Sequence, residues 1–71
     1  MQRIENMPKA KQYLTDNLQR IRTEMGLTPS GFERKYGISA SAIRRIEAGG
    51  EPKLLTTLNL FEALQLEEPC K

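Results

Sequence analysis

The sequence predicts an all-α fold, a compact domain of four or five helices. Apolar residues recur at helical spacing, and glycine or proline stands where each expected helix begins or ends. A clear alternation of apolar and polar residues is missing, apart from a short stretch at Arg3-Ile4-Glu5. Because the chain has only 71 residues, we expect a single domain with one modest core.

The first helix is expected from about Met7 or Pro8 to Met25. Proline suits the first turn of a helix, and Gly26 is a typical residue just after the last turn. A helical wheel gathers the apolar residues on one narrow stripe, which should face the core. The stripe consists of Met7, Ala10, Leu14, Leu18, Ile21 and Met25.

The next two helices are expected close together, at Pro29–Tyr36 and Ala40–Ala48. Thr28 and Ser39 precede them, and their hydroxyls are suited to accept from the free N–H groups of a first turn. Only Gly37-Ile38-Ser39 separates the two segments. A connection this short predicts that the helices cross steeply, as in a helix-turn-helix.

A fourth helix is expected after Pro52, over about Leu55–Leu66. Its inward stripe should be Leu54, Leu58, Phe61 and Leu64, with Leu60 and Ala63 pointing away from it. We therefore divide the chain into an N-terminal arm at 1–6, a helical domain at 7–66 and a short tail at 67–71. The arm could contact DNA, pair with a second copy or be disordered.

The composition argues against an enzyme or a metal protein. The chain has no histidine, which is the commonest general base and metal ligand. It also lacks a glycine-rich phosphate loop and a paired nucleophile and base, so we expect no cofactor. The single cysteine, Cys70, is interpreted as a reduced thiol on the tail, although a redox switch or an intermolecular disulfide is the alternative.

Charge and hydropathy favour a nucleic-acid partner over a membrane. Residues 1–53 hold ten basic and six acidic residues, a net charge of +4, whereas residues 54–71 carry a net charge of −2. No run is apolar enough to cross a membrane, and the charged N-terminus does not match a signal peptide. We expect a soluble, cytoplasmic protein.

The third predicted helix presents small residues and two arginines on its outer face. Ala42, Ile43 and Ile46 should face the core, which leaves Ser41, Arg44 and Ala48 outward and Ala40 and Arg45 at the two edges. Small side chains allow close approach to a groove, and arginine reads guanine through two parallel hydrogen bonds. The alternative is an ordinary solvated face, since charged residues normally lie on surfaces.

These residues resemble the phage-repressor/Cro helix-turn-helix family, often called XRE-like. The resemblance covers about Leu14–Leu66. It rests on Leu18-x-x-Ile21-Arg22-x-x-Met25-Gly26-Leu27-Thr28, Phe32, Tyr36-Gly37-Ile38-Ser39, Ile43-x-x-Ile46-Glu47-x-Gly49, Pro52 and Thr57-Leu58-x-x-Phe61-x-Ala63-Leu64.

The resemblance implies a lambda-repressor-like domain whose third helix binds in the major groove of double-stranded DNA. The implied base contacts are Ala40, Ser41, Arg44 and Arg45. The implied phosphate contacts are Thr28, Ser30, Ser39, Gly50 and Lys53. Arg34 and Lys35 could add to these or serve only solubility. Arg22 and Glu47 match a charged pair that recurs in the family, which we interpret as structural.

Three positions depart from the family pattern, namely Pro29, Gly31 and Glu33. The family usually has glutamine near the start of the second helix, a longer side chain at the place of Gly31 and alanine at the place of Glu33. Glu33 is therefore expected to turn into solvent or to pair with Arg34, Arg44 or Arg45. Pairing with an arginine of the third helix would weaken DNA binding.

The implied function is a transcriptional regulator, a repressor in our interpretation, that binds a palindromic operator as a homodimer. Two half-sites would lie roughly 34 Å apart. The dimer surface is expected at Leu55, Leu60 and Ala63, unless the N-terminal residues bury them. One alternative is an antitoxin-type adaptor that binds a toxin and autoregulates its operon, and another is a protein-binding module that has lost DNA contact.

Overall fold

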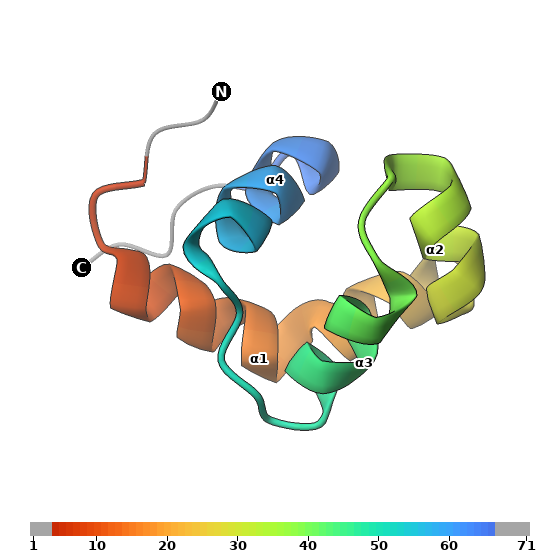
Figure 1. Ribbon diagram of the computed structural model, residues 1–71, viewed down its shortest axis with the longest axis horizontal. Helices are drawn as coiled ribbons and strands as arrows, with labels where there is room; N and C mark the ends of the chain where they lie inside the picture. Colours follow the sequence, from red (N-terminus) through yellow and green to blue (C-terminus); the bar gives the residue numbers. More distant parts are fainter. Residues whose placement is uncertain (1–3, 67–71) are drawn as a thin grey trace.

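Four helices account for most of the computed structural model, which describes residues 4–66 (Figure 1). They are α1 (Met7–Glu24), α2 (Pro29–Tyr36), α3 (Ala40–Glu47) and α4 (Leu54–Leu64). No strand occurs within these described residues. The prediction of an all-α domain is confirmed, with helix ends within two residues of those expected. Cys70 and the predicted tail lie outside the described range.

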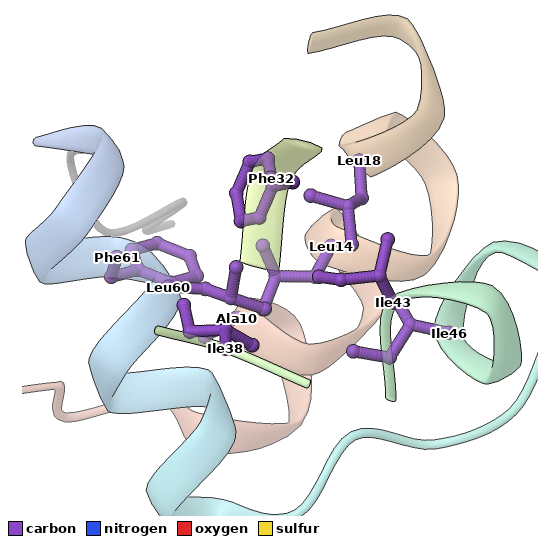
Figure 2. Packing of buried hydrophobic residues seen from close by; sticks show 9 residues of the cluster. All are labelled: Ala10, Leu14, Leu18, Phe32, Ile38, Ile43, Ile46, Leu60 and Phe61. Atoms are coloured by element: carbon purple, nitrogen blue, oxygen red, sulfur yellow. The ribbon is translucent and has the colours of Figure 1, made fainter. Parts of the chain in front are cut away.

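The hydrophobic core joins all four helices. Side chains from α1, α2, α3 and α4 point toward one another in Figure 2, and α1 packs against both α3 and α4. The core cluster comprises Ala10, Leu14, Leu18, Phe32, Ile38, Ile43, Ile46, Leu60 and Phe61. Because Ile43 and Ile46 are fully buried in it, the opposite face of α3 is turned outward.

The ends of α1 differ from the sequence expectation in two ways. Asn6, placed in the predicted arm, caps the helix by accepting from the backbone N–H of Lys9 at 3.2 Å. Ile4 of the same arm packs against the core. Met25, expected on the buried stripe, is 37% exposed because the helix ends at Glu24 and the chain reverses at Gly26.

The turn between α2 and α3 depends on Gly37. Its φ of 78° is left-handed, a conformation that costs a residue with a Cβ more than it costs glycine. Its N–H donates to the carbonyl of Glu33 at 2.7 Å, which closes the end of α2. Ile38 then lies buried under the turn, as the sequence predicted.

The buried face of α4 was predicted only in part: Phe61 is buried as expected and Leu64 packs against the core, but two leucines differ. Leu60, expected to point outward, has no exposed surface, whereas Leu54 of the expected inward stripe is 57% exposed. The buried face instead carries Thr57, Leu60 and Phe61. Apolar residues occur around much of this helix, so a wheel does not define one face. Thr57 was not expected inside, but its hydroxyl donates to the carbonyl of Lys53 at 2.9 Å, which satisfies it there.

The start of α3 is capped by a residue of α2. Ser39 makes no side-chain capping bond, contrary to expectation. The backbone N–H of Ala40 instead donates to Oε1 of Glu33 at 3.2 Å. Among the residues that the structure describes, Glu33 forms no ion pair with the three candidates from the sequence, Arg34, Arg44 and Arg45. Its negative charge lies where the helix dipole is positive.

We predict that Glu33→Ala lowers the free energy of unfolding by about 1 kcal/mol, since it removes a capping acceptor from α3. Ser39→Ala is the matched control and should change stability by less than about 0.5 kcal/mol, because the Ser39 side chain caps nothing. Urea denaturation followed by circular dichroism measures both. Equal losses in the two variants would contradict the assignment of the cap to Glu33.

Candidate nucleic-acid interface

The outer face of α3 is exposed and carries two unpaired positive charges. Ser41, Arg44, Arg45 and Ala48 are exposed, while the two isoleucines of the helix face the core. Over the part of the chain that the structure describes, neither arginine head group has an ion-pair or hydrogen-bond partner. The guanidinium groups are therefore available to an external ligand rather than committed to the protein's own carboxylates.

Ala40 does not belong to this outer face. Only 8% of its surface is exposed, because α2 packs against the start of α3 and Glu33 lies over its backbone nitrogen. The expected contact between its methyl group and a base is therefore not available in this structure. Sequence periodicity placed Ala40 at an edge of the helix, and only the position of α2 shows that this edge is covered.

A shallow groove of about 340 Å³ runs from the start of α3 to the start of α4. It is lined by Ser39, Ser41, Ala42, Arg45, Lys53 and Thr56. The groove thus combines two cationic side chains with three hydroxyl groups, a set of donors suited to phosphate oxygens. Thr56 was not among the sequence candidates. In the sequence, Thr56 is marked only by a hydroxyl three residues after Lys53, and that spacing alone does not indicate that the two side chains share a groove with Arg45.

Gly50 lies directly against the base of the Arg45 side chain. Its N–H donates to the Arg45 carbonyl at 2.8 Å. A Cβ at Gly50 would lie 2.8 Å from Cγ of Arg45 and 2.9 Å from that carbonyl oxygen. The loop after α3 can therefore pass this close to Arg45 only because residue 50 has no side chain.

An ion pair attaches the same loop to α1. Nζ of Lys11 lies 2.9 Å from Oε2 of Glu51, with 21% of the lysine side chain and 75% of the glutamate side chain exposed. Pro52 is buried beside it. Three contacts therefore hold this loop against the domain: the Gly50 N–H to α3, the Glu51 carboxylate to α1 and the buried ring of Pro52. The loop carries Gly50 and Lys53, two candidate phosphate contacts.

The start of α2 presents two further candidates. The Thr28 hydroxyl caps α2 by accepting from the N–H of Gly31 at 3.0 Å, and its own proton remains available to an outside acceptor. Ser30 is exposed. Arg34 and Lys35 are exposed as well, and Nζ of Lys35 lies 5.5 Å from the ring centroid of Tyr36. Lys35 thus makes a cation–π contact within the domain.

Arg22 and Glu47 form a bidentate ion pair between α1 and the end of α3. Nε of Arg22 donates to Oε2 of Glu47 at 2.7 Å, and Nη2 donates to Oε1 at 2.9 Å. The remaining nitrogen, Nη1, donates to the carbonyl of Leu27 at 2.7 Å. The hydrogen bond to Glu47 raises the pKa of Arg22 above its ordinary value, despite the opposing effect of burial. The arginine is therefore charged at any physiological pH.

A family model described as helix-turn-helix matches residues 18–69, which is most of the chain. The chain belongs to the helix-turn-helix family of the XRE type, whose members are DNA-binding transcriptional regulators rather than enzymes. Neither curated proteins nor solved structures gave a match. None of the helices within residues 4–66 is long and apolar enough to cross a membrane.

We predict that Arg22→Met and Glu47→Leu each lower the free energy of unfolding by about 3 kcal/mol, because each leaves a charge with 13% or less of its side chain exposed and without its ion-pair partner. The double variant should lose clearly less than the sum. Arg20→Met is the control, since the Arg20–Glu24 pair is exposed and worth at most about 1 kcal/mol. Additive losses in urea denaturation would refute a coupled pair.

Gly50→Ala should lower the free energy of unfolding by about 1–3 kcal/mol, since the new methyl group meets backbone that cannot move aside freely. Glu51→Ala in the same loop removes only the exposed ion pair with Lys11, so its effect should stay below about 1 kcal/mol. Thermal and urea unfolding compare the two variants. A Gly50→Ala protein as stable as the parent would show that the loop does not need this close approach.

Proposed function

We propose that this protein is a repressor that binds a palindromic operator as a homodimer, with α3 inserted in the major groove. The observation that carries the proposal is the pair of unpaired arginines on an exposed helix face that is otherwise formed by small residues. Such a face allows the helix backbone to approach base edges closely. A dimer bound over a promoter would then block the polymerase sterically.

Base recognition is assigned to Ser41, Arg44 and Arg45. Arginine donates two parallel hydrogen bonds to O6 and N7 of guanine, and each such contact is worth roughly 1–3 kcal/mol of discrimination. Serine can donate to or accept from a base. Ala40, a base-contact candidate from the sequence, is left out of this assignment because it is buried.

Phosphate contacts are assigned to both sides of α3. On one side lie Thr28 and Ser30 at the start of α2, and on the other lie Lys53 in the loop and Thr56 beside it. Gly50, a candidate from the sequence, is left out because its only donor, the backbone N–H, is bonded to the Arg45 carbonyl. Two lines of donors flanking a recognition helix match the two DNA strands that border a major groove. These contacts would fix the orientation of the helix without reading sequence.

The dimer surface is assigned to the exposed start of α4. Leu54 and Leu55 are 57% and 60% exposed and adjacent, although leucine is a residue that proteins usually bury. Ala63 is half-buried and packs against the core further along α4, and Leu60 belongs to the core itself, so both are left out of this surface. A second copy covering Leu54 and Leu55 would place two α3 helices on one duplex.

Selection of binding sites from a random DNA pool with the purified protein tests the whole proposal. Two inverted half-sites with centres about one helical turn apart are expected. A single half-site would contradict the homodimer, and a pool without enrichment would contradict sequence-specific binding.

Arg45→Ala should weaken binding to the selected operator by about five- to 100-fold while binding to unrelated DNA changes much less. Lys53→Ala is the contrasting variant, because a phosphate contact adds to both kinds of binding. It should weaken both equally and reduce the slope of log K against log salt by about 1. Titrations at several salt concentrations measure both effects. Equal losses for Arg45→Ala would show that Arg45 contacts phosphate.

A further inference from the structure

The Glu33 carboxylate lies at the leading end of the helix that is proposed to enter the groove. Oε1 accepts the N–H of Ala40, the first residue of α3, at 3.2 Å. Glu33 is exposed, and its second oxygen, Oε2, has no hydrogen-bond partner within residues 4–66. One oxygen thus fixes the position of the carboxylate, and the other is left free to accept a hydrogen bond from outside.

This position excludes a phosphate from the same place. The first N–H of α3 is already satisfied by a carboxylate, and two negative groups at short distance repel each other. The sequence suggested that Ser39 and the start of α3 would contact phosphate. The structure instead puts an acceptor at the Ala40 N–H, so a ligand that contacts the free oxygen of Glu33 must bring a hydrogen-bond donor.

The major groove offers few donors. Cytosine presents its N4 amino group, and adenine presents N6 beside the N7 acceptor, whereas guanine and thymine present acceptors at these positions. A carboxylate next to adenine would face N7 as well as N6, and N7 would repel it. Cytosine is therefore the base whose edge best complements a lone carboxylate oxygen.

We propose that Glu33 is a specificity-determining residue, whose Oε2 accepts from N4 of a cytosine at the base pair facing the first turn of α3. The proposal rests on the proposed insertion of α3 in the major groove, where the N-terminal residues of a recognition helix contact base edges. Glu33 then performs two tasks with one carboxylate: it caps the recognition helix and reads a base.

Glu33→Gln separates these tasks. The amide oxygen of glutamine can still accept from the Ala40 N–H, so the cap and the fold should persist. The other end of the amide becomes a donor, which cannot accept from cytosine. The amide NH2 can donate instead to an acceptor, such as O6 or N7 of guanine or O4 of thymine. The variant should therefore lose its preference for cytosine at one position of each half-site and favour guanine or thymine there.

Binding-site selection with the parent protein, Glu33→Gln and Asp16→Asn tests this. Asp16→Asn is the control, because it removes one negative charge from α1, which packs behind α3. On α1 the Asp16 carboxylate accepts from Nε2 of Gln12 at 2.9 Å. We expect the parent and Asp16→Asn to select the same cytosine, and Glu33→Gln alone to change that position. The same base in all three selections, or the same change in both variants, would overturn the proposal.

A double-mutant cycle, in which the DNA base and residue 33 are changed separately and together, measures the contact between them as a difference in affinity. Replacing the selected cytosine by thymine should weaken parent binding by about five- to 100-fold. The same replacement should leave the affinity of Glu33→Gln unchanged or raise it, because the amide NH2 can donate to O4 of thymine. Equal losses in both proteins would overturn the role of Glu33. If the parent protein selects no site, sequence-specific binding itself is refuted. If it selects an operator whose sequence is the same for Glu33→Gln, only the role of Glu33 is refuted.

Discussion

The position of α3 depends first on the ion pair between Arg22 and Glu47. A single guanidinium binds the carboxylate at the end of α3 and the carbonyl of Leu27 in the loop before α2. It thereby joins α1, the α1–α2 connection and α3 through charge-assisted hydrogen bonds, which are directional and short. Hydrophobic packing by Ile43 and Ile46 turns the helix toward the core, but packing alone is not directional. The ion pair, which is directional, fixes the orientation of α3 relative to α1.

Two glutamates therefore hold the two ends of the same short helix. Glu47 fixes the last turn through Arg22, and Glu33 fixes the first through the N–H of Ala40. An eight-residue helix is too short to be stable alone, so its geometry must come from tertiary contacts. Within residues 4–66, the head groups of Arg44 and Arg45 have no partner, since Glu47 binds Arg22 and Glu33 binds the backbone of Ala40 rather than an arginine. The same two contacts that hold the helix therefore leave its arginines available.

Much of this architecture could be predicted from local pattern. The stripe through Leu14 and Leu18, the left-handed glycine at Gly37 and the burial of Ile38 each follow from spacing or from backbone preference. The face of α4 could not be predicted in this way, because apolar residues occur around much of that helix. Its orientation is set by what α1 and the core can accommodate, and there a threonine with a satisfied hydroxyl packs in preference to Leu54.

The sequence by itself determined the helices, their order and the two arginines on one helix face, because these depend on neighbours within a few residues along the chain. Only the tertiary structure decided that Ala40 is covered, that Glu33 rather than Ser39 caps α3, and that Thr56 joins Lys53 and Arg45 in one groove. Each of these features joins residues of different elements. Their distances follow from how the helices pack, and helical periodicity carries no information about that packing.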